Sequence, residues 1–199
     1  MIYFLVLSFF PSNAQPTRGE IYQLPEGVSL QTLPLDTVLK KVNIALDNMT
    51  GTTDTLIKQD LWKLLARAKA TKDPLYIAKV YQCLADWHYI SLSSEKADSI
   101  YFYDQKALIL LLQTNDKELI SRAYRTVGMD LDELQQYAQA EIHYFKGLEI
   151  AESIGSQKNI NSIYAALSVH YSNIKDYESA LKYNQSAVAA YEKEENTHP

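Results

Sequence analysis

The stretch that decides the fold is EIHYFKGL at residues 141–148, which recurs as YFYDQKAL at 101–108 and as LKYNQSAV at 181–188. The copies start 40 residues apart, and a small residue, alanine or glycine, stands in the seventh position of each. Self-similarity at a fixed period of about 20–50 residues is the mark of a repeat architecture. The sequence therefore predicts an array in which each repeat packs against its neighbours.

Each repeat is predicted to contain two helices. A second helical stretch precedes each of the last two copies, and there Tyr124 aligns with Tyr164 and Gly128 with Ser168 at the same offset. Helices can cross closely only where side chains are small, and neighbouring aromatic side chains then fill the grooves beside the contact. The recurring small and aromatic positions therefore predict antiparallel helix pairs.

These spacings resemble the tetratricopeptide repeat family, whose unit of about 34 residues places large, apolar and small residues at fixed positions over two helices. The last copy carries the resemblance best, through Tyr164, Leu167, Ser168, Tyr171, Tyr177, Ala180 and Ala187. The resemblance implies an all-α fold, a right-handed α-solenoid of about four antiparallel hairpins. Repeats with helices this long are similar to those of bacterial sensor and regulator proteins.

The resemblance also divides the chain. Three repeats are predicted within residues 74–199, at 78–120, 121–160 and 161–199. Residues 34–73 offer two more amphipathic stretches without the small-residue pattern, so a degenerate hairpin is predicted there. Residues 15–33 mix proline, glycine and polar residues without a helical period, which predicts an extended lead-in.

Residues 1–14 are predicted to form a secretory signal peptide. The apolar run MIYFLVLSFF is followed by small residues at Ser12 and Ala14, which suit cleavage after Ala14. The first basic residue, Arg18, follows this point instead of preceding the apolar run, so the alternative is a short apolar segment packed on the first helix. Export to the periplasm or secretion is expected, with a cytoplasmic location as the alternative. No membrane span is expected, because one takes about 20 apolar residues.

Composition narrows the function. The net charge is −5, and no basic stripe of the kind that nucleic-acid binders carry is present, so a nucleic-acid partner is not expected. The single cysteine, Cys83, excludes an intramolecular disulfide and is predicted to be a buried thiol.

No catalytic constellation is found in the sequence. The four histidines, His88, His143, His170 and His198, fall on different predicted helices or in the tail, without a pair spaced to hold a metal. The glycines are isolated and form no phosphate-binding loop. We therefore expect no catalytic residue, no metal, no cofactor and no enzymatic activity.

The family resemblance implies a ligand groove lined by the first helix of each hairpin. The positions that would face it are Lys79, Gln82, Asp86 and Tyr89, then Arg122, Arg125, Met129, Asp132 and Glu133, then Ser162, Ala165, Val169, Ser172 and Asn173. Within this set, the cationic side chains can pair with a peptide carboxylate. The alternative is solvated surface charge.

The sequence thus predicts a non-catalytic scaffold, exported, that binds a protein or peptide. One alternative is the periplasmic sensory input region of a signal-transduction protein, such as a histidine kinase or a transcriptional regulator, because no polar capping helix follows the last repeat. Self-association through the C-terminal hairpin is a further possibility, since the same apolar face would be exposed.

Overall fold

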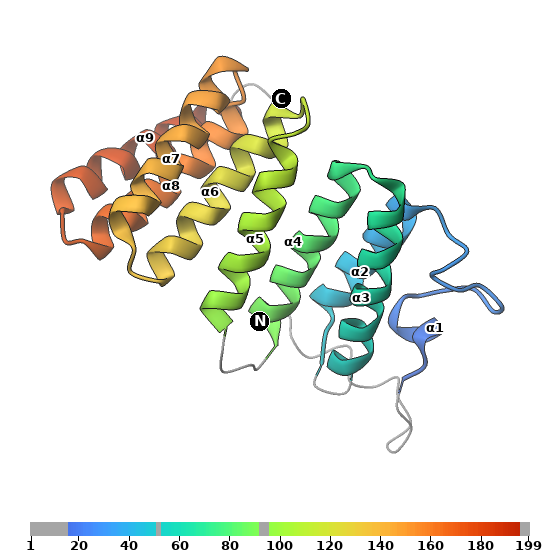
Figure 1. The fold of residues 1–199 in the computed structure, drawn as a ribbon. Coiled ribbons are helices and arrows are strands. Elements are labelled where there is room, and N and C mark those ends of the chain that lie inside the picture. The colour runs from blue at the N-terminus through green and yellow to red at the C-terminus, as the bar shows by residue number, and fades with distance from the viewer. Residues whose placement is uncertain (1–15, 51–52, 92–95, 196–199) are drawn as a thin grey trace. The chain divides into compact units, whose positions relative to one another are not determined.

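The computed structural model describes residues 16–50, 53–91 and 96–195, with side chains as far as residue 189. All the regular structure in these ranges is helical (Figure 1). The chain divides into an N-terminal unit, Met1–Ser93, and a C-terminal unit, Ser94–Pro199. None of the described helices carries an apolar stretch long enough to cross a lipid bilayer.

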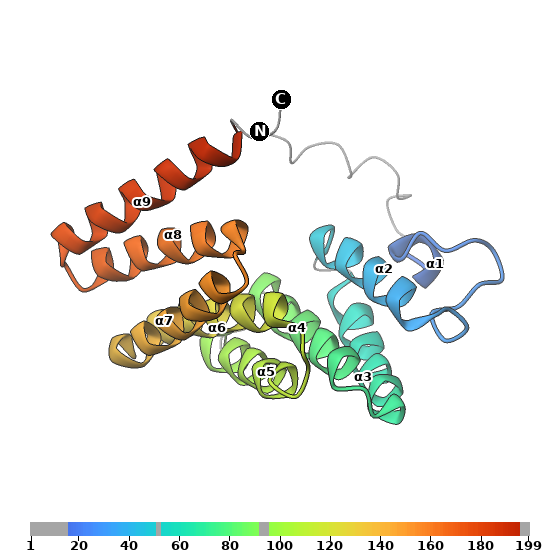
Figure 2. The same ribbon diagram turned by 90° about the horizontal axis from the view of Figure 1, so that it is seen from above.

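The N-terminal unit contains α1 (Arg18–Ile21), α2 (Leu35–Asp47), α3 (Asp54–Thr71) and α4 (Pro74–Ile90). Helix α4 begins with a proline at its first position and is capped by Asp73, whose carboxylate accepts a hydrogen bond from the Leu75 amide at 2.9 Å. It packs against both α2 and α3, which Figure 2 shows as neighbouring rods. The buried apolar side chains include Val38, Val42, Leu61, Leu65, Ala78 and Leu84.

Cys83 lies in this core. Its side chain is 3% exposed, and its thiol donates to Oδ1 of Asn43 at 3.2 Å. Burial raises the pKa of the Cys83 thiol to about 12. The prediction of a buried thiol is confirmed.

The lead-in to this unit is not wholly extended, so that part of the prediction is wrong. Residues 18–21 form the short helix α1 because Thr17 and Glu20 make a capping box. The Glu20 amide donates to Oγ1 of Thr17 at 3.3 Å, and the Thr17 amide donates to the Glu20 carboxylate at 2.7 Å. Tyr22, which follows the helix, is 2% exposed and ties the segment to the core.

The C-terminal unit contains α5 (Lys96–Leu111), α6 (Lys117–Glu133), α7 (Tyr137–Ser153), α8 (Gln157–Asn173) and α9 (Tyr177–Glu195). Each helix packs against the next, and α6 also packs against α8. The first residues of α6 and α8 are 40 apart, as are those of α7 and α9. The side chains of Asp116 and Ser156 cap α6 and α8 at equivalent positions. The period read from the sequence is therefore the structural repeat.

The turns between these helices share one geometry. After α7, the Ser156 amide donates to the Ala151 carbonyl at 2.9 Å while Gly155 adopts a left-handed φ of 66°. The turns after α6 and α8 have the same backbone hydrogen bond, which joins an amide to the carbonyl five residues earlier. Their left-handed residues are Gln135 and Lys175, with φ of 58° and 64°. This bond pattern ends a helix and reverses the chain, and glycine adopts the required φ at least cost. Gly155 thus follows the end of α7 as its left-handed capping residue.

Small residues mark the helix crossings, as predicted. A Cβ atom on Gly128 would lie 2.7 Å from Cε1 of Tyr144, and one on Gly147 would lie 3.0 Å from the carbonyl oxygen of Ser121. The Ser121 hydroxyl donates to the Gly147 carbonyl at 2.8 Å across the same crossing. Helices α6 and α7 therefore approach more closely than side chains larger than hydrogen would allow at these points.

The predicted fold class, an all-α array of packed consecutive helices, is confirmed. The right-handed sense, the tetratricopeptide type and the repeat boundaries stay predictions. The proposed repeat at 78–120 combines α4 and α5, which belong to different units. The proposed signal peptide at 1–14 lies outside the described residues.

The variant Gly128→Ala tests the close crossing. Alanine is the better helix former by about 1 kcal/mol, but its methyl group would meet the Tyr144 ring, which is 1% exposed and cannot swing away. Overpacking of this kind costs about 1–3 kcal/mol. We expect a net loss of about 1 kcal/mol in urea unfolding, whereas a gain in stability would show that the crossing has room to spare.

Candidate functional site

The predicted ligand residues of α4 lie in the N-terminal unit. Lys79 and Gln82 are half-buried, whereas Asp86 and Tyr89 are exposed. The Lys79 ammonium lies 3.6 Å from Oδ1 of Asp36 and 5.6 Å from the centroid of the Tyr76 ring. Its charge is therefore already balanced by a carboxylate.

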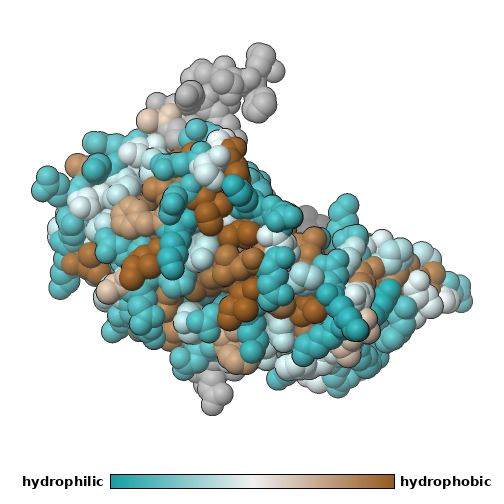
Figure 3. Space-filling view, turned by 45° about the horizontal axis from the view of Figure 1, so that its top comes forward, coloured by the Kyte–Doolittle hydropathy of each residue, from teal (hydrophilic) through white to brown (hydrophobic). Residues whose placement is uncertain are grey.

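The predicted ligand residues of α6 and α8 lie in the C-terminal unit, on two helices that pack against each other. Equivalent positions 40 residues apart face the same way: Met129 is 45% exposed and Val169 is 60% exposed. Figure 3 shows apolar groups interspersed with hydrophilic ones over the part of the surface that this unit forms. We name this surface the α6–α8 face, and define it by Arg122, Arg125, Met129, Ser162, Ala165 and Val169.

The α6–α8 face combines positive charge with apolar surface. Arg122 is exposed, and Nη1 of the half-buried Arg125 donates to Sδ of Met129 at 3.4 Å. None of its six residues is acidic. The remaining residues predicted for this groove on α8, Ser172 and Asn173, are exposed at the end of the helix, as is Glu133 on α6.

Asp132 does not line the groove, and the prediction that it does is wrong. The residue is 9% exposed. Its Oδ2 accepts a hydrogen bond from the Tyr144 hydroxyl at 2.8 Å, and its Oδ1 accepts one from Nδ1 of His170 at 2.7 Å. Burial and the neighbouring carboxylate raise the pKa of the Tyr144 phenol, so this group donates at every physiological pH. Asp132 turns inward because two buried donors, on α7 and α8, require its oxygens.

A second buried acidic group lies two positions before Asp132 on α6. Asp130 is 9% exposed, and its carboxyl is hydrogen-bonded to that of the buried Asp104 on α5. A hydrogen bond between two carboxyl groups requires a proton on one of them. Burial, with the nearby charge of Glu133, raises the pKa of Asp130 to about 7 despite the opposing hydrogen bond.

The 40-residue offset relates these two polar pairs. Asp104 and Asp130 stand at the positions that Tyr144 and His170 occupy one repeat later. His170 is 1% exposed, and its ring centroid lies 5.6 Å from that of Tyr144. The sequence around His170 does not predict its hydrogen-bond partner Asp132, which lies 38 residues away. Aligning the repeats at every polar position would have revealed that one site is filled by two different pairs.

Tyr124 packs less deeply than the sequence suggested. It is half-buried, with its ring centroid 5.8 Å from that of His143 and 5.9 Å from the Lys146 ammonium. The fully buried aromatic residue of this repeat is Tyr144. Among the described residues, no three His, Cys, Asp or Glu side chains are grouped so as to hold a metal ion.

The fold and this surface define a helical-repeat protein. Among solved structures, the chain is similar to the crystal structure of BtubC (BKLC) from P. vanneervenii, with a TM-score of 0.68 and 17% identity over 80% of this chain and 64% of that one. It also matches the apo form of RapI, with a TM-score of 0.49 and 15% identity over 83% of this chain and 67% of that one. The chain thus spans about 64% of the length of BtubC. No protein-family model and no curated protein matches it.

The variant Asp130→Asn tests the shared proton. Because the folded pKa of about 7 lies above the ordinary value of 3.8, the folded state binds this proton more tightly, and its stabilising effect is lost as pH rises through 7. At about 1.4 kcal/mol per pKa unit, the asparagine variant should be more stable than the wild type by up to a few kcal/mol at pH 8. The difference should shrink at pH 5. Urea unfolding at both pH values measures it.

The exposed Glu149 supplies the control for that comparison. Glu149→Gln removes a carboxylate from the same unit without touching the buried pair, so it should alter stability little at either pH. An Asp130→Asn variant that loses stability equally at both pH values would contradict the shared proton.

Proposed function

We propose that the chain is a non-catalytic scaffold that binds a protein or peptide segment, and that it is exported to the periplasm or secreted. The α6–α8 face carries the proposal, because it exposes matched positions of two adjacent helices whose buried side chains belong to the core. The helical-repeat fold supports a binding role, and the apolar start of the sequence supports export. A sensory input region of a signal-transduction protein is the alternative, in which the same face would receive the signal.

The chemistry of the face favours a segment with both an acidic and an apolar side chain. Arg122 and Arg125 can donate paired hydrogen bonds to a carboxylate. Met129, with Val169 on the neighbouring helix, offers apolar surface, and a flexible methionine adapts to differently shaped side chains. The charges of the two arginines make this binding sensitive to salt.

The double variant Arg122→Ala with Arg125→Ala tests this function. Peptides selected from a displayed random library against the wild-type chain serve as ligands, and fluorescence polarisation measures their affinity. Losing charge-assisted hydrogen bonds should cost about 1.5–3 kcal/mol, which is roughly a ten- to hundredfold weakening. The difference should fade at high salt, while the folding stability changes by about 1 kcal/mol at most.

Lys146→Ala with Lys182→Ala is the matched control, since it removes two positive charges from α7 and α9 outside the face. It should bind the selected peptides as the wild type does. If both double variants weaken binding equally, the loss comes from the removal of positive charge in general and not from the α6–α8 face, which would contradict the proposal. A fold-sensitive reference is Tyr144→Ala, which deletes a buried aromatic side chain and should cost about 3–5 kcal/mol of stability.

Self-association is a second candidate function, and an observation on α9 favours it. In α7, Tyr137 and Leu148 face α8: the Tyr137 ring centroid lies 6.3 Å from that of His170, and Leu148 is 9% exposed. The equivalent α9 residues, Tyr177 and Val188, are 67% and 50% exposed. We propose that two copies of the chain associate through α9, so that each covers the exposed Tyr177 and Val188 of the other.

The variant Leu181→Lys tests self-association. Leu181 lies on the same side of α9 as Tyr177 and is 57% exposed, so a lysine there should not disturb the fold. Light scattering of the wild type should show a mass that rises with protein concentration, and the variant should stay monomeric. Ile142→Lys, at a 53% exposed position of α7, is the control and should associate normally. A wild type that stays monomeric at high concentration rejects this candidate.

A further inference from the structure

A cavity in the N-terminal unit has the composition of a ligand site. It lies between the segment that follows α1 and helix α3, has a volume of about 220 Å³, and is open to solvent. We call it the N-terminal hollow, and the lining residues that matter are Arg18, Leu24, Val28, Leu30, Asp60 and Lys63. A smaller hollow of about 40 Å³ adjoins it and shares Leu30, Asp60 and Lys63.

The polar end of the N-terminal hollow is organised by one buried carboxylate. Asp60 is 6% exposed, and its Oδ2 accepts from Nε of Arg18 at 2.7 Å and from the Tyr22 hydroxyl at 3.2 Å. Its Oδ1 lies 3.5 Å from the Lys63 ammonium. Two cations thus share one carboxylate, which leaves a single positive charge in excess.

Both cations remain accessible to a ligand. The side chains of Arg18 and Lys63 are 43% and 55% exposed. Within the described residues, the Lys63 ammonium makes no ion pair apart from the long contact with Asp60, although it carries three donors. An incoming anion can therefore take up donors that the protein leaves to solvent.

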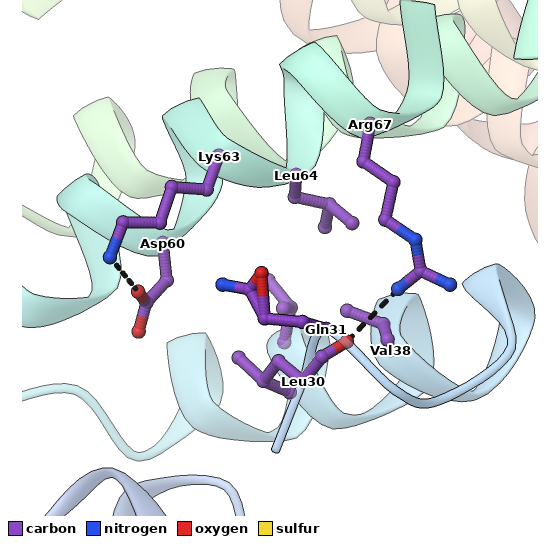
Figure 4. A pocket seen from close by; sticks show the side chains of 8 residues that line it. Leu30, Gln31, Val38, Asp60, Lys63, Leu64 and Arg67 are labelled. Carbon is purple, nitrogen blue, oxygen red and sulfur yellow. Dashed lines mark hydrogen bonds and ion pairs between the residues drawn. The ribbon is translucent and has the colours of Figure 1, made fainter. Parts of the chain in front are cut away.

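The non-helical segment that lines the hollow is held in place by two cationic side chains, Lys41 of α2 and Arg67 of α3. The Lys41 ammonium donates to the carbonyls of Tyr22 and Gln23, at 3.2 and 3.0 Å. The Arg67 guanidinium donates to the carbonyl of Leu30 at 2.9 Å and also to that of Leu33. Figure 4 shows Asp60 and Lys63 at one end of the smaller hollow and Arg67 at the other, with Leu30 and Gln31 between them. A segment held in this way presents a formed site.

We propose that the N-terminal hollow binds a monocarboxylate attached to a short apolar group. The excess of one positive charge matches a single carboxylate better than a dianionic phosphate, and Leu24, Val28 and Leu30 offer an apolar wall beside the cations. The volume is below the roughly 300–1,000 Å³ of typical ligand pockets, so the ligand is small. Two sources share this chemistry, namely a free short-chain carboxylic acid and the C-terminal carboxylate of a peptide that ends in an apolar residue.

Calorimetric titration of the full chain tests the site with four probes: hexanoate and hexanamide, then N-acetyl-Leu-Leu with a free carboxylate and with an amidated end. We expect the carboxylates to bind and the amides to bind at least tenfold more weakly, because the amides cannot receive charge-assisted hydrogen bonds. Binding of hexanoate identifies a free acid as sufficient. Binding of the peptide carboxylate alone identifies a chain terminus.

Three variants make the outcome decisive. Lys63→Gln should weaken carboxylate binding about tenfold or more, and Val28→Glu should abolish it by placing a negative charge in the wall. Lys40→Gln, which removes an equal charge from an exposed position of α2 outside the hollow, should bind as the wild type does. Absence of binding by both carboxylates at millimolar concentration, equal binding of acids and amides, or equal loss in both lysine variants would overturn the proposal. The Arg122 and Arg125 double variant should leave this binding unchanged, so the two sites succeed or fail separately.

Discussion

The C-terminal unit depends on the buried carboxylate of Asp132. Its two oxygens receive hydrogen bonds from Tyr144 on α7 and His170 on α8, so one side chain of α6 fixes the positions of both neighbouring helices. Burying a carboxylate is costly unless its oxygens are satisfied, and a buried donor that loses its acceptor costs about 1–3 kcal/mol. Any sliding of α7 or α8 along α6 would break these bonds. The register of the three helices is therefore set by polar contacts as well as by apolar packing.

This constraint also orients the α6–α8 face. Arg125 and Met129 lie seven and three residues before Asp132, on the same side of α6 by helical spacing, so the buried Asp132 marks the end of this face. Helix α8 is held in register by His170, so Ala165 and Val169 stand beside their equivalents on α6. A surface built on packed helices keeps its side chains at fixed spacings, which is what recognition of an extended segment requires.

Two successive repeats place a pair of polar side chains at equivalent positions, but the residue types in the two pairs differ. Tyr144 and His170 fill the site between α7 and α8, and Asp104 with Asp130 fills the equivalent site between α5 and α6. Asp132 accepts hydrogen bonds from both members of the first pair, whereas the second pair needs a shared proton. One backbone arrangement thus holds two junctions of different chemistry, and the second weakens as pH rises through 7.

Sequence alone predicted the features that depend on near neighbours in the chain. The 40-residue period and the close crossing at Gly128 follow from local spacing, and the structure bears them out. Asp132 was misplaced because its orientation is decided by donors 12 and 38 residues away, which no helical position reveals. Four residues are too few to show a helical period, so only the capping box of Thr17 and Glu20 marks the helix at 18–21 in the sequence.

The two candidate sites are built on opposite principles. The α6–α8 face is regular, and its positions follow from the repeat. The N-terminal hollow arises from an irregular segment tied to helices through contacts such as Arg18 with Asp60, 42 residues apart, and Arg67 with Leu30, 37 residues apart. Both place positive charge in excess on a chain whose net charge is −5. Because the chain as a whole repels anions, recognition of a carboxylate at either place must come from these local excesses of positive charge.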